Sequence, residues 1–237
     1  MYQNKRVILI VPFFNEKGRI AEVIKKTEQT SIDEVCAVDD GSADGGAATI
    51  KEMGVTLLSH PERKGVGAAI RTGIKHALTN NFDIIVVCAG NDKDNPKEVD
   101  RLLKPIIEED YDYIHGSRFL KGGRWGNLPF YRLILAKVSS FLFSLLVGQK
   151  FTDVTNGFRA YKIEVIKDPR INLDQEWLNT YELESYLQYK AIALGYKFKE
   201  VPVSKIYPTK KTTKMKPFIG WWKMVKPIVL LKLKLKR

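Results

Sequence analysis

Two adjacent aspartates, Asp39 and Asp40, follow a short apolar run and precede a Gly-Ser turn. Neighbouring carboxylates at the end of a strand are costly to bury unless they bind a partner or stay hydrated. Pro12, Asn15 and Glu16 follow the preceding apolar run in a similar way. Carboxylate oxygens accept hydrogen bonds from a nucleobase or from ribose hydroxyls, so this spaced set indicates a nucleoside site. Asp40 alone is equally explained as a turn former or a helix N-cap.

A glycine-rich segment, HPERKGVGAAIRTG at 60–73, has the composition of a phosphate-binding loop. Gly65 and Gly67 permit close backbone approach, while Lys64 and Arg71 supply positive charge beside it. Backbone N–H groups at the start of a helix bind a diphosphate well. Glycines alone are weak evidence, and an ordinary helix start remains an open alternative.

Four cations follow in a second group: Arg118, Arg124, Arg132 and Lys137. The planar guanidinium can bond a phosphate through two parallel hydrogen bonds, which makes arginine well suited to this ligand. For an arginine at a helix start, a plain surface cation is the competing interpretation.

The elements around these residues alternate between apolar runs and helical patterns. We predict strands at 7–14, 34–40, 55–60, 82–91, 111–117 and 196–203, and helices at 17–30, 43–53, 65–79, 96–109, 130–148 and 180–195. This β-α order is typical of an α/β fold with a mostly parallel sheet flanked by helices. Ligands on such sheets lie at the carboxyl ends of the strands, where the polar residues of this chain also fall.

Charge is distributed unevenly along the 237 residues. The chain has 39 Lys and Arg against 27 Asp and Glu, a net charge of +12, and the segment 201–237 contains no acidic residue. In that segment lysines alternate with Trp221, Trp222 and aliphatic residues. Tryptophan favours the membrane interface and lysine stems extend toward headgroups, so we expect 211–237 to be a basic amphipathic tail on an anionic membrane surface. Nucleic-acid binding is disfavoured, because phosphates do not require bulky aliphatic neighbours.

The location predicted from sequence is the cytoplasmic face of a membrane. The N-terminal apolar run, 7–14, lacks a cleavage site and is no signal peptide. No uninterrupted apolar stretch reaches the roughly 18 residues of a spanning helix, so we expect peripheral association. Cys36 and Cys88 lie in apolar runs and are expected to be buried free thiols.

Five segments in order resemble the family-2 glycosyltransferases with a GT-A fold, in particular the dolichyl- and polyprenyl-phosphate sugar synthases. They are VPFFNE with AVDDGSADG, HPERKGVGAAIRTG, GSRFLKGG, the run from LPFYRLILAK to NGFRAY, and LGYKFKEVPV. The resemblance covers about residues 6–216. It implies a GT-A-like domain over 1–210 that moves a sugar, with inversion, from a nucleotide-diphosphate sugar to a polyprenyl phosphate.

The resemblance also implies roles for individual residues. The expected nucleotide-sugar contacts are Pro12, Phe14, Glu16, Asp39, Asp40, Lys64, Gly65, Arg71 and Asn91. The expected acceptor-phosphate contacts are Arg118, Arg132, Lys137, Arg159 and Lys214. Asp92, Asp94, Arg118 and Arg132 are the expected catalytic residues, because stabilising the leaving diphosphate is the main demand. Arg159 has a second interpretation as a structural partner of Asp153.

The family's divalent metal site is altered in this chain. The family holds Mg²⁺ or Mn²⁺ with an Asp-x-Asp pair, and alignment on Pro96 places Ala89 and Asn91 at those positions. Hard cations need oxygen ligands, so Asn91, Asp92 and Asp94 are the candidates in a shifted geometry. Two alternatives remain open: Lys and Arg replace the metal, or the site is inactive.

Three other functions remain possible at this stage: transfer to a polysaccharide or another non-lipid acceptor, non-catalytic nucleotide-sugar binding at a membrane, and nucleic-acid binding. A membrane-embedded subunit is a further candidate partner.

Overall fold

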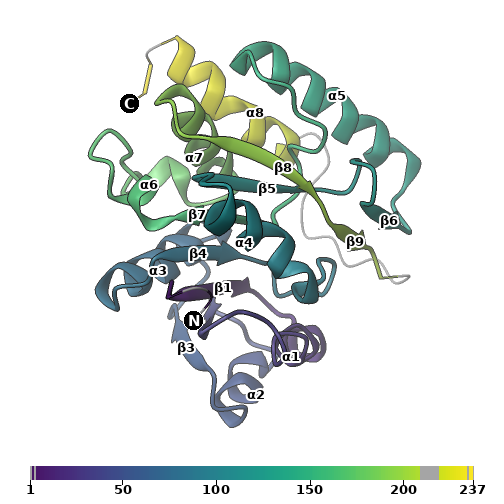
Figure 1. Cartoon of the computed structure of the whole chain (residues 1–237). Coiled ribbons are helices and arrows are strands. Elements are labelled where there is room, and N and C mark those ends of the chain that lie inside the picture. Colours follow the sequence, from purple (N-terminus) through teal and green to yellow (C-terminus); the bar gives the residue numbers. More distant parts are fainter. Residues whose placement is uncertain (1, 3, 209–218, 234, 237) are drawn as a thin grey trace.

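A seven-stranded mixed sheet forms the centre of the molecule (Figure 1). The computed structural model describes residues 2, 4–208, 219–233 and 235–236. Across the sheet the strands are β3 (Thr56–Ser59), β2 (Glu34–Asp39), β1 (Val7–Phe13), β4 (Ile84–Val87), β7 (Arg159–Lys162), β5 (Tyr113–Ser117) and β8 (Phe198–Pro202). Only β7 runs antiparallel to its neighbours, which confirms the α/β fold with a mostly parallel sheet.

Strand β1 lies inside the sheet and is buried along its whole length. Ile8 and Ile10 contribute to the apolar core on one face of the sheet, while Leu9 and Val11 contribute to the core on the other face. Because both faces are covered, the sequence of β1 is continuously apolar rather than alternating. Each such side chain contributes about 1.5–3 kcal/mol when fully buried.

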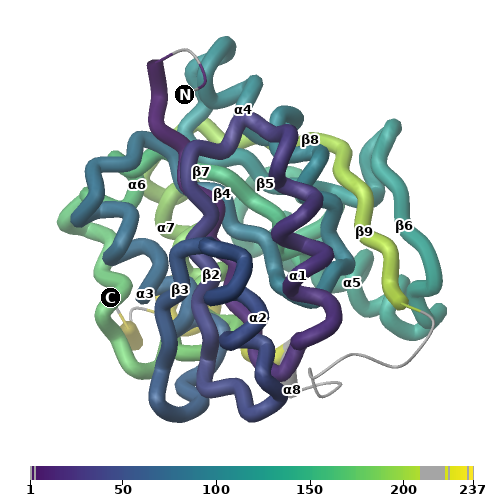
Figure 2. The backbone as a smooth tube through the Cα atoms, turned by 90° about the horizontal axis from the view of Figure 1, so that it is seen from below, coloured from purple at the N-terminus to yellow at the C-terminus, as the bar shows by residue number. Residues whose placement is uncertain are grey.

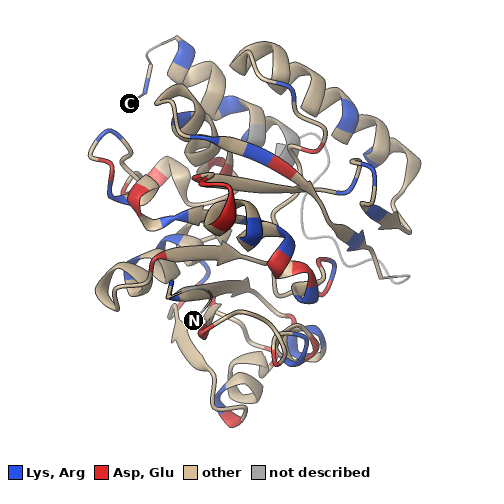
Figure 3. Cartoon of the chain, viewed as in Figure 1, with Lys and Arg blue, Asp and Glu red and all other residues tan. Residues whose placement is uncertain are grey.

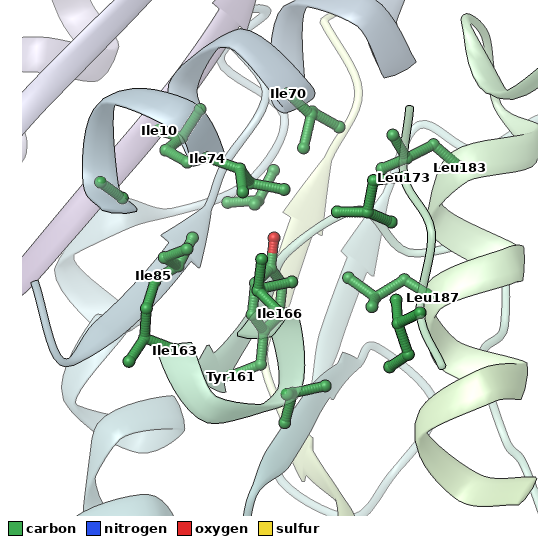
Figure 4. Packing of buried hydrophobic residues seen from close by; sticks show 14 of the residues in the cluster. Ile10, Ile70, Ile74, Ile85, Tyr161, Ile163, Ile166, Leu173, Leu183 and Leu187 are labelled. Carbon is green, nitrogen blue, oxygen red and sulfur yellow. The ribbon is translucent and has the colours of Figure 1, made fainter. Parts of the chain in front are cut away.

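Helices cover both faces of the sheet. On one side are α1 (Lys17–Lys25), α2 (Gly46–Glu52) and α4 (Val99–Glu108), the last preceded by a 3₁₀ turn at Pro96–Glu98. On the other are α3 (Val66–Thr79), α6 (Ile163–Lys167) and α7 (Glu182–Ala193). In Figure 4, side chains from α3, α6 and α7 converge on Ile85 and Tyr161 of the sheet. The three-layer arrangement holds the strand ends in fixed relative positions.

The antiparallel strand β7 is the part of the sheet that the sequence pattern did not reveal. It has four residues and follows a turn at Asn156-Gly157, so it is too short to show a period. Its first residue, Arg159, pairs with Val87 at the end of β4 and with His115 of β5. The loop before β7 therefore lies beside the carboxyl ends of its neighbours.

Two further helices lie outside the central layers. Helix α5 (Phe130–Val147) and helix α8 (Ile219–Lys232), which falls within the basic tail, pack together around a third apolar cluster. Phe143 and Ile228 are almost fully buried in this cluster. Two short strands, β6 (Arg124–Gly126) and β9 (Ser204–Ile206), lie side by side at one edge of the molecule (Figure 2).

Helix α5 presents most of its apolar surface to the outside. Its exposed large side chains are Phe130, Tyr131, Ile134, Val138, Phe141 and Leu145. Among the described residues, α5 is the one helix with the length and apolar composition to cross a membrane, and 22% of its 18 residues are buried. Arg132 and Lys137 interrupt its sequence, so α5 contains no uninterrupted apolar run of that length.

Candidate active site

A cavity of about 300 Å³ opens at the carboxyl ends of β1 and β4. Its wall continues across the start of α3 and the start of α5 to α7 and β9. Among its lining residues are Pro12, Phe14, Glu16, Asp40, Arg63, Gly65, Ala89, Asn91, Lys93, Arg118, Arg132, Tyr181, Glu184 and Lys205. The structure therefore brings together Pro12, Phe14, Glu16, Asp40, Gly65, Asn91, Arg118 and Arg132 from the predicted set.

Asp40 shapes the loop that forms one wall of the cavity. Its Oδ1 accepts the backbone N–H of Lys64 at 2.9 Å, and its Oδ2 accepts that of Gly65 at 2.8 Å. Its Oδ1 also lies 2.9 Å from Nδ1 of His60. Asp39 has a similar local role, since it accepts the backbone N–H of Ser42 at 3.0 Å. Asp40 thus reaches the cavity while Asp39 and the side chain of Lys64 do not line it.

The glycines at the start of α3 permit close packing against a neighbouring turn. A Cβ atom at Gly67 would lie 2.1 Å from the carbonyl oxygen of Leu178, and one at Gly65 would lie 2.4 Å from that of Asn179. Arg71 holds the same turn, donating to the carbonyl oxygen of Leu173 at 2.8 Å and to the Asn179 side chain. The Arg71 side chain thus binds within the protein and does not line the cavity.

The loop after β4 presents its residues to the cavity in a pattern that the sequence did not indicate. Ala89, Asn91 and Lys93 line the cavity, whereas Asp92 and Asp94 do not. Asp92 has a left-handed backbone, with φ of 55°, and its carboxylate lies 2.5 Å from Lys26 Nζ. Asp94 is buried against Lys205, with its Oδ1 2.5 Å from Nζ.

These residues do not fit a divalent metal ion. Within the described part of the chain, no group of three or more His, Cys, Asp or Glu side chains is placed to hold one. The carboxylates that line the cavity have other partners: Glu16 lies 2.7 Å from Arg19, and Glu184 lies 3.1 Å from Arg159. The position of the family's first aspartate holds only the methyl group of Ala89, which offers no oxygen ligand.

Two lysines that sequence analysis missed lie at the cavity instead. Lys93 is 8% exposed and Lys205 is 7% exposed. Burial, and then the positive charge of Lys205, lowers the pKa of Lys93 to about 8. The Lys93 ammonium lies over the Tyr207 ring, 5.1 Å from its centroid. Little in the sequence indicates that these lysines reach the cavity. Lys93 is the only cation between two aspartates in NDKDN, and Lys205 follows the last predicted strand.

Arg118 is fixed by a buried ion pair at the floor of the cavity. Its Nε donates to Asp153 Oδ2 at 2.6 Å and its Nη2 to Oδ1 at 2.9 Å. It also donates to Thr155 and to the Tyr207 hydroxyl. Burial alone would raise the pKa of Asp153, but the adjacent guanidinium outweighs that effect and holds the pKa below its usual range.

The other predicted phosphate contacts are separated in space. Arg132, in the first turn of α5, lines the main cavity, whereas Lys137 lines a second, shallow groove next to Phe119. Arg159 is buried and donates to the Tyr113 hydroxyl and to the carbonyl oxygen of Asn156. Lys214 lies outside the described residues.

A mixed sheet with helices on both faces, and a cavity at the carboxyl ends of its strands, is the arrangement found in GT-A glycosyltransferases. A match to glycosyl transferase family 2 over residues 8–168 shows that the chain belongs to this family. It is therefore a glycosyltransferase.

Two relatives agree with this assignment, and a solved structure has a similar fold. The chain is 28% identical to a polyprenol monophosphomannose synthase of Mycolicibacterium smegmatis, over 84% of this chain and 77% of that protein. It is 28% identical to a UDP-N-acetylglucosamine–dolichyl-phosphate N-acetylglucosaminyltransferase of Methanococcus voltae, covering 86% and 87%. The fold is similar to the glucosyl-3-phosphoglycerate synthase of Mycobacterium tuberculosis, solved with Mn²⁺, UDP and product, with a TM-score of 0.69, 17% identity and coverage of 98% and 80%.

Proposed function

We propose that the protein transfers a sugar from a nucleotide-diphosphate sugar to a polyprenyl phosphate, with inversion at the anomeric carbon. The observation that carries this proposal is the position of Arg132. It lines the cavity and also belongs to the first turn of α5, whose apolar face is exposed. A ligand with a phosphate head and a long apolar chain fits such a junction. The dolichyl phosphate named for the M. voltae relative has this chemistry, as does the polyprenol phosphate part of the compound named for the M. smegmatis relative.

The donor half of the cavity lies toward β1 and α3. Phe14 forms part of the wall, and the Arg63 guanidinium lies over its ring, 4.4 Å from the centroid. Glu16 lies beside Phe14, and Asp40 supports the loop that carries Arg63. We assign the nucleoside to this end and the diphosphate to the cations next to it.

The reaction is a single displacement. An oxygen of the acceptor phosphate attacks the anomeric carbon while the bond from that carbon to the donor diphosphate breaks and its electron pair leaves with the nucleoside diphosphate. The attacking phosphate is already an anion, so no general base is required. Arg118 and Arg132 hold the acceptor phosphate in line, and fixed cations stabilise the leaving group. The predicted metal set Asn91, Asp92 and Asp94 enters no step, because those side chains do not fit the ion.

The surface around α5 suits an anionic membrane. Segment 118–152 contains no Asp or Glu but six Lys and Arg, and Figure 3 shows blue positions along α5 and β6 with none in red. Apolar side chains of an interface helix enter the headgroup boundary while neighbouring cations attract anionic lipids. We therefore place α5 on the cytoplasmic surface of a membrane, with the cavity mouth facing the lipid acceptor.

Replacing Arg132 with Met is expected to raise the KM for the lipid acceptor by roughly 10- to 100-fold, because a charge-assisted hydrogen bond contributes about 1.5–3 kcal/mol. The assay supplies UDP-, GDP- and dTDP-sugars together with undecaprenyl or dolichyl phosphate, and measures lipid-linked sugar. The KM for the donor should change little. Arg124→Met is the control, since Arg124 is exposed on β6 and does not line the cavity. Product formed only with a polysaccharide acceptor would contradict the proposal.

Two glutamates on the exposed face of α5 are expected to abolish vesicle binding. Phe141 and Leu145 are 62% and 64% exposed and lie one turn apart. In Phe141→Glu/Leu145→Glu, the apolar contact is lost and two negative charges face the anionic lipid. Flotation with vesicles containing phosphatidylglycerol measures the effect. Ala48→Glu/Thr79→Glu adds the same charge at exposed positions on α2 and α3 and should float like the unmodified protein. Equal flotation of all three proteins would show that α5 does not contact the membrane.

A further inference from the structure

We infer that Lys93 and Lys205 take the place of a divalent cation, binding the diphosphate of the donor so that binding and transfer need no metal ion. This inference rests on the nucleotide-diphosphate sugar proposed above as donor. It adds a charge-neutralising role for two residues outside the predicted site.

The first argument is the placement of charge around the loop after β4. Lys93 is buried, lines the cavity, and forms no ion pair within the described part of the chain. A buried ammonium without an ion-pair partner is costly; the nearby charges of Glu16 and Asp94 offset part of that cost, and a bound anion offsets more. Lys205 lines the same cavity from β9, and the backbone of Ile206 donates to the carbonyl oxygen of Lys93 at 2.8 Å. The two ammonium groups therefore come from adjacent segments.

The second argument is that the local carboxylates are already engaged. Asp94 holds Lys205 at 2.5 Å, and Asn156 Oδ1 lies 3.3 Å from the same ammonium. Asp92 is paired with Lys26, which directly follows α1, and does not line the cavity. Asp94 thus orients a cation toward the ligand, where an aspartate in a metal site would coordinate the ion directly. Two fixed ammonium groups supply the same formal charge as one divalent ion.

The chemical consequence concerns the leaving group. As the bond between the anomeric carbon and the diphosphate breaks, negative charge grows on the diphosphate oxygens. Donors that are already fixed in position stabilise that charge without reorganising. No proton transfer, oxidant or additional reactant is needed.

The test measures binding of UDP, GDP and dTDP to the full-length protein by calorimetry, in EDTA and in excess MnCl₂. We expect at least one nucleotide to bind in EDTA with a Kd within about threefold of its value in Mn²⁺. Lys93→Met should raise that Kd by roughly 10- to 100-fold. Lys93→Arg should recover part of the affinity. Lys97→Met is the matched control, because Lys97 is exposed and does not line the cavity.

A second experiment tests whether metal dependence can be introduced into the site. In Ala89→Asp/Asn91→Asp/Lys93→Met two carboxylates replace the lysine, and we expect Mn²⁺ to tighten nucleotide binding at least tenfold. Thermal melting confirms that each variant is folded. Binding by the unmodified protein only in Mn²⁺, or an unchanged Kd in Lys93→Met, would overturn this inference and leave the proposed function standing. Absence of nucleotide binding under both conditions would overturn both.

Discussion

Replacing Asp153 with Asn is expected to lower the free energy of unfolding by about 3–5 kcal/mol. Asp153 is fully buried, and its two carboxylate oxygens accept hydrogen bonds from the Arg118 side chain. Asn keeps the size of the side chain but removes its charge, so the Arg118 guanidinium is left buried without compensation. Urea unfolding followed by circular dichroism measures the loss.

Two comparisons separate this effect from a general sensitivity to substitution. Glu22 forms an exposed pair with Lys25, and Glu22→Gln should change the unfolding free energy by less than about 1 kcal/mol. Arg118→Met/Asp153→Leu removes both charges and should be more stable than Asp153→Asn, while losing the acceptor contact. If Asp153→Asn is no less stable than Glu22→Gln, the buried pair does not stabilise the fold.

The same pair has a defined pH dependence. The pKa of Asp153 is held below its usual range, so its contribution is fully present above the ordinary aspartate value of about 3.9. It is lost as the pH falls through the lower pKa of the folded protein. The pair therefore supports stability at neutral pH, and its contribution is lost on acidification below the ordinary aspartate range.

Replacing Asp40 with Ala is expected to weaken nucleoside diphosphate binding by at least 100-fold and to lower the unfolding free energy by about 3 kcal/mol. The carboxylate accepts the backbone N–H groups of Lys64 and Gly65 and contacts His60. Hydrogen bonds to a charged group contribute about 1.5–3 kcal/mol each, and part of that loss is recovered by water. The wall carrying Arg63 then loses its fixed position.

The control for Asp40 is Asp44, which also bonds backbone N–H groups. Its carboxylate accepts from Lys17 at 2.8 Å and from Gly46 at 2.9 Å, but it does not line the cavity. Asp44→Ala should lower stability while leaving nucleotide affinity within about twofold, as measured by urea unfolding and calorimetry. If both variants bind nucleotide equally well, Asp40 does not organise the donor site.

Most of the sheet could be predicted from the sequence, because its parallel strands are covered on both faces and show continuous apolar runs. Strand β7 could not, since four residues after a turn carry no period. Ligands on parallel sheets bind at the carboxyl ends of the strands. This rule predicted that Glu16, Asp40 and Asn91 lie together at that edge of the sheet, and all three line the cavity.

The hydrogen-bond partners of individual side chains around the site could not be predicted from the sequence. Arg71 donates to a carbonyl group 102 positions away, and Arg159 donates to the Tyr113 hydroxyl 46 positions away. Nothing in the sequence near either arginine shows that a distant backbone or hydroxyl oxygen will occupy it. In the loop after β4, the left-handed residue Asp92 changes which side chains face inward, so Lys93 rather than the aspartates reaches the cavity.

The pairing of Asp94 with Lys205 spans 111 positions of the chain, and this separation has a consequence for synthesis on the ribosome. Strands β1 to β4 and the helices between them emerge first and carry the wall that we assign to the nucleoside. The cavity nevertheless lacks one of its two buried lysines until β9 has been translated and has left the exit tunnel. A nascent chain that ends before β9 therefore lacks Lys205, and we expect it not to stabilise a leaving diphosphate. We expect activity to begin only after β9 has been translated.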